Sequence, residues 1–327
     1  MKYRNLGKHG LKISEISIGT MYHGSYISRE NSTKALTEAL NQGINFIDCA
    51  DRYGIFDSEL DFDKRTRAEI LVGEFLKDYD REDLVISSKV FYKMRESPNS
   101  GGLSRKHIRE EIKHSLEYLQ TDYLDIYFCH RPDRDTPLAE TITVMSRLVD
   151  EGIIHYWGTS WWPPVMIERT IALARERGYH PPSVEQPPYH FNARFIETDL
   201  LDIASYHGLG ITAFEALAGG FYTGKYLNGI PEGSRSSKTH FVTEEIIETR
   251  REQLQKLTEI ANSLDIPLCQ LALAWVLRLP EISSTIMGAS KPEQVIVNAG
   301  ASDVTLDSDI VDQIEQILNN KPASPFR

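Results

Sequence analysis

Cysteine is scarce in this chain of 327 residues, which contains only Cys49, Cys129 and Cys269. None of them forms a Cys-x-x-Cys pair, so a zinc ribbon and a thioredoxin-like redox motif are excluded. Cys49 and Cys129 lie in apolar runs, where a free cysteine behaves as a small hydrophobic core residue. So few cysteines are typical of a reducing compartment, and we expect a cytoplasmic location.

Long hydrophobic runs and a basic excess are also missing. No apolar stretch is long enough to span a membrane, and the N-terminus MKYRNLGKHGLKIS has no signal-peptide core. Lys and Arg number 36 against 47 Asp and Glu, giving a formal net charge of −11. We therefore expect no nucleic-acid partner and no membrane insertion. An anionic cofactor stays possible, because a few well-placed cations suffice to bind phosphate.

The sequence does contain a regular alternation of short apolar or β-branched runs with helical patterns. The runs number eight and cover 15–19, 45–49, 84–89, 124–130, 155–160, 183–187, 210–217 and 285–289. Near-continuous apolar strands fit a parallel sheet covered by helices. We predict an α/β fold, a closed (β/α)8 TIM barrel forming a single domain over 1–327, with an N-terminal β-hairpin over 2–6 and 11–14. An open, doubly wound sheet is the alternative.

Residues of capping type mark several helix ends. Ser104 is predicted to cap a helix, and Thr136 and Pro137 are predicted to be the N-cap and first residue of the next one. Gly152 is expected to close that helix. Residues 226–243 are expected to form a long polar loop before a helix over 244–264, and loops of this length are usually functional.

Polar residues stand at the ends of successive predicted strands, where TIM barrels carry their catalytic groups. They are Asp48 with the nearby Tyr53, then Lys89, then His130. A carbonyl that accepts a hydride needs a proton donor and a positive field at its oxygen. A lysine ammonium lowers the pKa of a nearby tyrosine, a carboxylate orients that lysine, and a histidine donates a hydrogen bond. We predict that these four residues form a proton-delivery set.

At these residues the whole chain resembles the aldo-keto reductases. The pattern Asp48-x-x-x-x-Tyr53-Gly54, with Lys89 after a strand and His130 in YLDIYFCHRPD, is similar to the catalytic tetrad of that family. MKYRNLGKHGL, GLSRKHI, YWGTS, LAGGFYTGKY, GASKPEQ and ILNNKP are similar to the branch that contains potassium channel β subunits and their microbial relatives. The resemblance implies reduction of aldehydes or ketones to alcohols with NADPH, with Tyr53 as the general acid.

The resemblance also implies an extended NADPH/NADP+ site. Consistent with it, no Gly-x-Gly-x-x-Gly fingerprint follows a predicted strand. The implied contacts are Thr20, Met21, Asp48, Ser160, Gln186 and Phe214 around the nicotinamide, Leu217, Gly219, Lys225 and Arg235 along the phosphates, and Gly288, Ser290, Gln294 and Asn298 at the adenosine end. Ser290 is predicted to open a helix whose amides suit a 2′-phosphate.

Four residues depart from the pattern of the family. Phe214 stands where relatives often carry Trp or Tyr, and Glu215 replaces a usual Ser near the pyrophosphate. Val297 replaces a usual Glu near the adenine, and Trp161 stands where many members have Asn or Arg. A carboxylate at 215 repels phosphate unless it is turned away or paired, so NADH stays open as an alternative to NADPH.

Other interpretations remain open beside the reductase. A cofactor-binding, redox-sensing regulatory subunit is one alternative, although a histidine at position 130 favours catalysis because several channel subunits carry Asn there. An unrelated metal-dependent barrel enzyme finds no supporting carboxylate and histidine cluster, and no metal site is predicted. Asp51 and Arg52 are interpreted as a local ion pair. The expected partners are a small-molecule carbonyl substrate and further copies of the chain in a homo-oligomer.

Overall fold

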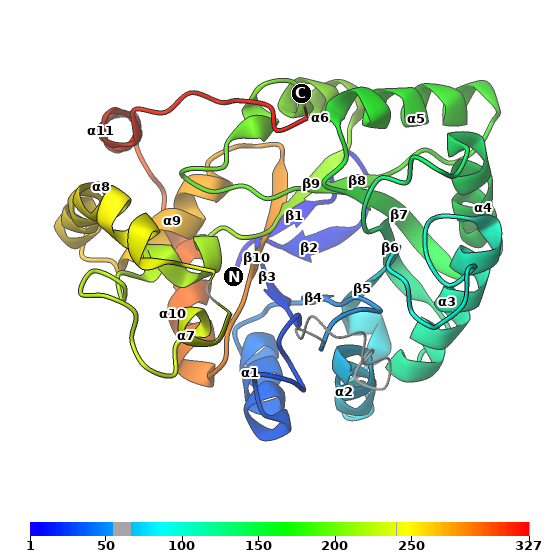
Figure 1. The fold of residues 1–327 in the computed structure, drawn as a ribbon, viewed down its shortest axis with the longest axis horizontal. Helices are drawn as coiled ribbons and strands as arrows, with labels where there is room; N and C mark the ends of the chain where they lie inside the picture. The colour runs from blue at the N-terminus through cyan, green and yellow to red at the C-terminus, as the bar shows by residue number, and fades with distance from the viewer. Residues whose placement is uncertain (55–66, 240, 327) are drawn as a thin grey trace.

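The centre of the computed structural model, which describes residues 1–54, 67–239 and 241–326, is a ring of parallel strands. The strands pair in the order β10-β3-β4-β5-β6-β7-β8-β9 and the sheet closes on itself (Figure 1). They are β3 (Ile16–Gly19), β4 (Phe46–Asp48), β5 (Val85–Val90), β6 (Leu124–Cys129), β7 (Ile154–Ser160), β8 (Val184–Gln186), β9 (Gly210–Ala213) and β10 (Ile282–Met287). The predicted TIM barrel is confirmed, and the alternative prediction of an open, doubly wound sheet is wrong.

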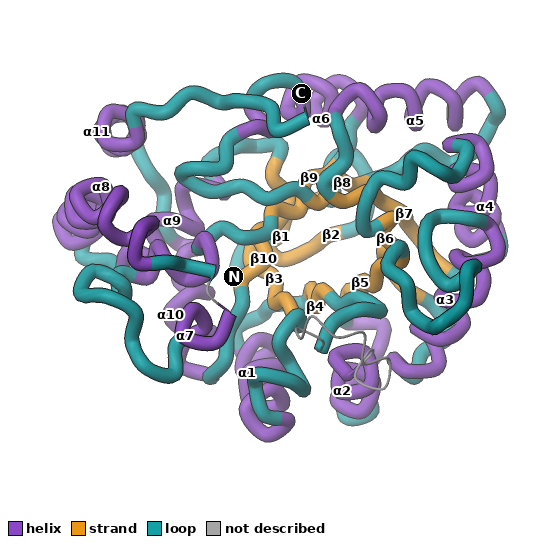
Figure 2. The backbone as a smooth tube through the Cα atoms, in the orientation of Figure 1, coloured by secondary structure: helices purple, strands orange, loops and turns teal. Residues whose placement is uncertain are grey.

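Helices lie outside this ring, as Figure 2 shows. They are α1 (Arg29–Asn41), α2 (Arg67–Leu76), α3 (Arg105–Leu119), α4 (Leu138–Asp150), α5 (Pro164–Glu176), α6 (Leu200–His207), α7 (Arg235–Thr239), α8 (Glu244–Ser263), α9 (Leu268–Leu277), α10 (Pro292–Ala299) and α11 (Ser308–Leu318). The Ser104 hydroxyl accepts a hydrogen bond from the amide of His107, so the predicted cap of α3 is confirmed. Ile108 and Ile112 of α3 are buried on one stripe, which holds the helix against the strands.

A small apolar cluster fills the inside of the barrel. It consists of Leu6, Ile13, Phe46, Val85, Ile126, Phe128 and Val184. Leu6 and Ile13 come from the N-terminal hairpin, in which β1 (Tyr3–Asn5) pairs antiparallel with β2 (Lys12–Ser14). The hairpin is seen through the ring of strands in Figure 1. Since it closes the end at which the strands begin, the other end of the barrel is left for chemistry.

Most predicted strand ends agree with the structure to within one residue, but two strands differ by three or more residues at one end. β9 stops at Ala213, although the apolar run extends to 217, because Glu215 and Ala218 adopt left-handed backbone angles with φ of 62° and 45°. β10 begins at Ile282, since buried serines continue the strand on its N-terminal side. The predicted long loop over 226–243 is also partly wrong, because it contains the short helix α7.

The predicted starts of two helices are each displaced by one or two residues. Pro137 is the N-cap of α4 rather than its first residue, and the Thr136 hydroxyl donates to Asp133 Oδ2 at 2.7 Å. The N-cap of α10 is Lys291, so Ser290 precedes the helix. The amide of Ser290 donates to Gln294 Oε1 at 2.7 Å, which means that it is already used within the chain.

Among the helices within the described ranges, none is both long enough and apolar enough to cross a membrane alone. Helices α8 and α9 meet this criterion only as a pair, by length and composition, with a bend of 89° between them.

Candidate functional site

Asp48 and Lys89 form a fully buried ion pair where β4 and β5 end. Lys89 Nζ donates to Asp48 Oδ1 at 2.8 Å, to Asp48 Oδ2 at 2.7 Å and to the Cys49 carbonyl at 2.6 Å. The Lys89 side chain has no exposed surface, and that of Asp48 is 3% exposed. A buried ammonium is stable only when its charge and its three N–H donors are matched, and here these contacts match them.

Asp48 is the centre of a wider hydrogen-bond network. Its Oδ1 accepts from Ser87 Oγ at 2.9 Å and from Gln186 Nε2 at 3.0 Å, and its carbonyl accepts from Thr20 Oγ1 at 2.9 Å. Ser87 is missing from the sequence prediction, although its position two residues before Lys89 places both on the same face of β5. The structure thus joins three of the predicted residues, Thr20, Asp48 and Gln186, to one carboxylate.

Tyr53 and His130 lie directly above this pair. Lys89 Nζ is 4.6 Å from the centroid of the Tyr53 ring, and the rings of Tyr53 and His130 meet edge to face with centroids 5.9 Å apart. Tyr53 is partly exposed, whereas Lys89 beneath it is not. The four residues predicted as a proton-delivery set therefore lie together, with the phenol nearest to the mouth of the barrel.

The pKa values of this group follow from burial. Burial, followed by the Asp48 carboxylate, holds the pKa of Tyr53 well above its usual value. The prediction that Lys89 lowers the Tyr53 pKa is therefore wrong for this structure, because burial and the Asp48 carboxylate outweigh any effect of the ammonium. Burial lowers the pKa of Lys89 and, reinforced by Lys89 and by Arg131, lowers the pKa of His130 well below its usual value. Tyr53 thus keeps its proton and His130 is a neutral imidazole.

Tyr92 and Arg52 form a layer over His130 that the sequence analysis missed. The Tyr92 ring meets His130 edge to face at 5.1 Å, and the Arg52 guanidinium lies 4.0 Å from the Tyr92 centroid. Arg52 is exposed and Asp51 is buried, so the two side chains point apart and the predicted ion pair between them is wrong. No hydrogen-bond partner for the Asp51 carboxylate lies within the described residues.

Arg131 contacts the backbone of His130. Its Nη1 donates to the His130 carbonyl at 2.6 Å and lies 3.5 Å from Ser160 Oγ. Its guanidinium is 5.2 Å from the ring centroid of Trp161, which has a left-handed backbone with φ of 54°. No hydrophobic period distinguishes Arg131 or Tyr92, because both lie in irregular segments after strands, and the motif YLDIYFCHRPD contains Arg131 without marking it as a contact of His130.

The predicted carboxamide-binding residues are neighbours. Ser160 Oγ donates to the Gln186 carbonyl at 3.0 Å, and β7 and β8 pair at these two residues. Phe214 follows β9 and forms an isolated bridge with Pro188. Met21 is an exposed side chain beyond Thr20. The structure therefore places Ser160, Gln186 and Phe214 at the ends of adjacent strands, and Gln186 connects them to Asp48.

The predicted phosphate-binding residues lie in the segment after β9. Leu217 precedes the 3-10 segment η4 (Ala218–Thr223), and Gly219 within it has φ of 67°. A Cβ at Gly219 would lie 2.1 Å from the Phe241 ring, so only glycine fits there. The Arg235 guanidinium lies over the rings of both Tyr22, at 4.4 Å, and Phe241, at 4.7 Å.

Lys225 and Arg235 are the two cations of this segment that are predicted to bind phosphate. The Lys225 ammonium is 5.0 Å from the Tyr226 ring centroid. No salt bridge within the described residues involves either cation, so both charges are available to an anion. Burial raises the pKa of Glu215, opposed by Arg235 and Arg131. Arg235 and Arg131 are thus close enough to Glu215 to offset part of its charge, which addresses the departure noted at this position.

The predicted adenosine-binding residues follow β10. A Cβ built on Gly288 meets no atom within 4 Å, so the backbone there is open to close approach. The Ser290 hydroxyl lies 3.1 Å from Gln294 Oε1, and the two side chains thus form one polar group. Asn298 is buried, and Val297 beside it is 40% exposed. Val297 accordingly offers an apolar surface where relatives carry a carboxylate.

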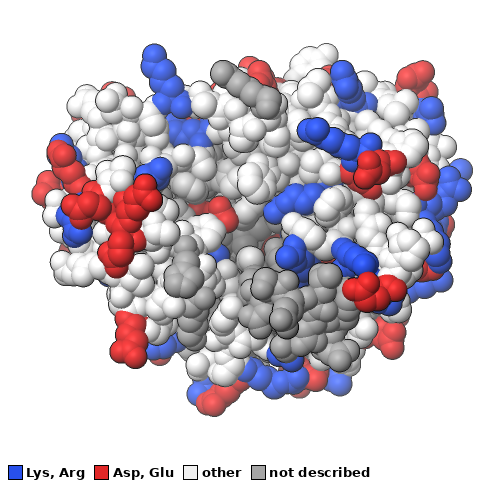
Figure 3. Space-filling view, in the orientation of Figure 1, with Lys and Arg blue, Asp and Glu red and all other residues white. Residues whose placement is uncertain are grey.

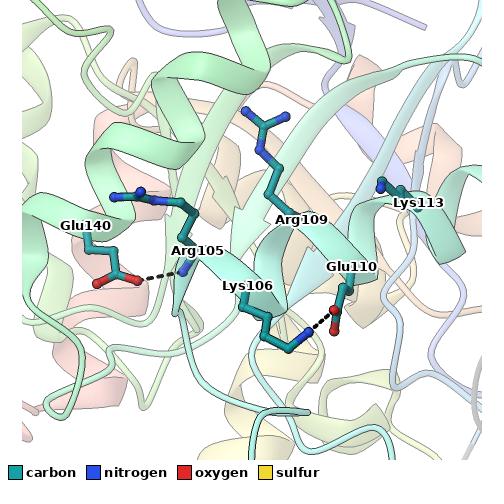
Figure 4. Close-up of a pocket in the computed structure, with 6 residues that line it drawn as sticks. All are labelled: Arg105, Lys106, Arg109, Glu110, Lys113 and Glu140. Atoms are coloured by element: carbon teal, nitrogen blue, oxygen red, sulfur yellow. Dashed lines mark hydrogen bonds and ion pairs between the residues drawn. The ribbon is translucent and has the colours of Figure 1, made fainter.

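A hollow lies far from these residues, on the outer helix layer. It has a volume of about 600 Å³ and is lined by Arg105, Lys106, Arg109, Glu110, Lys113 and Glu140 (Figure 4). Lys106 is bonded to Glu110, and Arg109 is paired with Glu151. Because this open groove is on α3 rather than at the strand ends, we do not place the reaction there.

Comparison with known proteins agrees with this geometry. A model described as the aldo/keto reductase family matches residues 15–319. Over 332 residues, the chain is 36% identical to a probable voltage-gated potassium channel subunit beta of Oryza sativa subsp. japonica, covering 98% of each chain. A protein of the same description from Arabidopsis thaliana is 37% identical over 335 residues, covering 99% of each chain. The chain therefore belongs to the aldo/keto reductase family of NAD(P)H-dependent oxidoreductases, which act on small carbonyl compounds.

Proposed function

We propose that this protein reduces aldehydes or ketones to alcohols with NADPH, and that Tyr53 is the general acid. The observation that supports this most is the buried Asp48–Lys89 pair directly beneath the Tyr53 ring. Lysine is rarely buried at such a depth without a functional or structural reason. A phenol with a neutral imidazole beside it and an ammonium below it fits proton transfer to a carbonyl oxygen.

Each side chain has a separate role in the reduction of the carbonyl. The dinucleotide supplies the hydride when it is bound. Tyr53 donates its phenolic proton to the oxygen, and its raised pKa keeps that proton in place at neutral pH. The Lys89 ammonium stabilises the phenolate left behind, while Asp48 fixes the position of Lys89. His130 donates an imidazole N–H to the same oxygen and thereby orients the substrate.

The residues present fit an extended dinucleotide. Ser160 and Gln186 stand beside Asp48 with polar groups for a carboxamide, and the Phe214 ring is available to a nicotinamide face. Lys225 and Arg235 carry charges that no described acid neutralises by a salt bridge, as the phosphates of NADPH require. Thr20, Met21, Leu217, Gly219, Gly288, Ser290, Gln294 and Asn298 complete the proposed set of cofactor contacts.

The test is turnover with a matched pair of tyrosine variants. Purified protein is mixed with NADPH and a panel of aldehydes, and the loss of cofactor absorbance is followed. We expect Tyr53→Phe to lower kcat by about 100-fold or more, since general acid catalysis contributes at least this much. Tyr206→Phe, at a tyrosine that is 81% exposed, serves as the control and should behave as wild type. Absence of turnover with every aldehyde, or equal rates for Tyr53→Phe and wild type, contradicts the proposal.

The names of the two plant relatives support a second candidate, a cofactor-binding regulatory subunit. A regulatory subunit has the same dinucleotide site as a reductase but uses it to sense redox state rather than to reduce a substrate. Tight NADPH binding without appreciable turnover, together with a stable complex with a membrane protein, favours the regulatory role. Multiple turnovers by a free homo-oligomer in gel filtration favour the reductase. The single-domain organisation, the homo-oligomeric state, the cytoplasmic location and the preference for NADPH over NADH stay predictions.

A further inference from the structure

We propose that Arg52 and Arg131 select carbonyl substrates that carry an anionic group, a carboxylate or a phosphate. The inference rests on the proposed reductase function and refines its substrate class. Both arginines lie next to His130, where the reacting carbonyl is expected. Neither belongs to the proton-delivery set, and neither is among the proposed cofactor contacts.

Arg52 is held in place by an aromatic ring rather than by an acid. Its guanidinium lies 4.0 Å from the centroid of Tyr92, and Tyr92 in turn meets His130 edge to face at 5.1 Å. A guanidinium that stacks on a ring keeps the N–H groups at its edge available to a carboxylate or phosphate. Arg52 is exposed, so a ligand reaches it from solvent.

Arg131 is fixed beside the same histidine, through its backbone. Its guanidinium is 5.2 Å from the Trp161 centroid, and its Nη1 donates to the His130 carbonyl at 2.6 Å. These contacts use one N–H group and the face of the guanidinium, which leaves further donors of the planar fork for a ligand. The two arginines therefore both lie next to His130, each with its orientation fixed in advance.

Neither guanidinium has a salt-bridge partner among the described residues, although Arg131 is close enough to Glu185 and Glu215 to oppose the raised pKa of both carboxyls. Within the parts of the chain that the structure describes, no salt bridge involves Arg52 or Arg131. This is unusual in a chain with a net charge of −11, where carboxylates are plentiful. Figure 3 shows Lys and Arg side chains gathered beside the hollow at the centre of this face. A local positive field at a concave site attracts anionic ligands even to an acidic protein.

Two other roles for these arginines predict different effects when the arginines are replaced. If they act only through the field on Tyr53 and His130, their loss slows every substrate alike. If they bind the phosphates of the cofactor, their loss weakens NADPH binding. Arg131 lies 3.5 Å from Ser160, at the proposed nicotinamide end, whereas the cations proposed for the phosphates are Lys225 and Arg235. The geometry therefore favours a contact with the substrate.

The experiment compares aldehydes that differ in charge alone. An aliphatic aldehyde with a terminal carboxylate is compared with its methyl ester, and a phosphorylated aldehyde with its unphosphorylated form. KM and kcat are measured for wild type, Arg52→Met, Arg131→Met and the double variant, and the dissociation constant of NADPH is measured for each. Arg105→Met removes an exposed arginine of the α3 groove and serves as the matched control.

We expect wild type to prefer the charged member of each pair, with the preference falling as salt is added. Each arginine variant should raise KM for the charged aldehyde by about tenfold or more, since a charge-assisted contact is lost. The value of kcat/KM for the neutral aldehyde and the affinity for NADPH should stay within about threefold of wild type. Arg105→Met should change none of these. The pair with the larger effect tells whether carboxylate or phosphate is the natural group.

Three results overturn the inference. They are equal kcat/KM of wild type for charged and neutral partners, equal losses for both partners in the variants, and weakened NADPH binding that accounts for the change. If neutral aldehydes are still reduced and the reduction depends on Tyr53, the proposed reductase function stands and only the proposed selectivity for anionic substrates is refuted. If no aldehyde is reduced at all, both proposals fall together.

Discussion

Lys89 and Asp48 can be treated as one thermodynamic unit, since each buries a charge that the other compensates. Removing one partner of a buried pair leaves an uncompensated charge and typically costs about 3–5 kcal/mol. We therefore expect Lys89→Met to lower the free energy of unfolding by this amount. The double variant Asp48→Asn/Lys89→Met should recover most of the loss, because no buried charge remains. Urea denaturation of the single and double variants measures both effects.

The single and double variants should rank differently in turnover rate than in stability. The double variant lacks the ammonium beneath Tyr53, so its turnover should stay at the level of Lys89→Met even where its stability returns. Lys93→Met, at an exposed lysine paired with Glu96, controls for the loss of a positive charge near the same loop. A double variant no more stable than Lys89→Met would show that the pair is not coupled as the hydrogen bonds indicate.

The residues of the site differ in how well they could be predicted from the sequence. Asp48 and Lys89 were predictable because a charged residue at the end of an apolar strand needs a reason to be buried. Ser87 had an available signal, its shared face with Lys89, which was not used. Tyr92 and Arg131 had none, since they lie in irregular segments where neither period nor capping constrains the side chain.

At the scale of elements, the N-terminal hairpin includes one very close backbone contact, at Gly7. Gly7 has φ of 57°, and a Cβ there would lie 2.3 Å from the Gly208 carbonyl oxygen and 2.5 Å from the Gly210 amide nitrogen. Backbone atoms at the start of β9 cannot move aside cheaply. We expect Gly7→Ala to lower the free energy of unfolding by about 2 kcal/mol or more, from the left-handed backbone and overpacking together.

Gly10 of the same turn is a matched control. A Cβ at Gly10 meets no atom within 4 Å, so Gly10→Ala should change stability by no more than about 0.5 kcal/mol. Thermal and urea midpoints of the two variants are compared side by side. Equal midpoints would mean that the hairpin is not seated against β9 as described.

The order and type of the barrel strands could be predicted because each apolar run is bounded by helical patterns. The ends of the strands could not be predicted, because backbone conformation rather than residue type determines where a strand stops. β9 stops at Ala213 because Glu215 and Ala218 take left-handed angles, which these residue types rarely adopt. Asp51 and Arg52 show the same limit, since adjacency in sequence suggested a contact that opposite side-chain directions prevent.

At the scale of the whole molecule, the stability of the fold should depend on pH through Glu69. This carboxyl lies between α2 and β5, where Oε1 accepts from Ser88 Oγ at 2.6 Å and Oε2 has no partner among the described residues. Burial raises the pKa of Glu69 from 4.5 to about 7. The folded protein thus binds this proton more tightly than the unfolded chain. The resulting stability is present below pH 4.5 and is lost as the pH rises to about 7.

Glu69→Gln imitates the protonated carboxyl and removes this dependence. Relative to wild type, the variant should gain roughly 2.5 kcal/mol in free energy of unfolding between pH 5 and pH 8, from linkage with the two pKa values above. Urea denaturation at several pH values measures the difference, and Glu82→Gln, at an exposed glutamate, controls for the loss of a negative charge. Parallel stability profiles for wild type and Glu69→Gln would show that this carboxyl titrates equally in the folded and unfolded chains, which its burial against β5 does not permit.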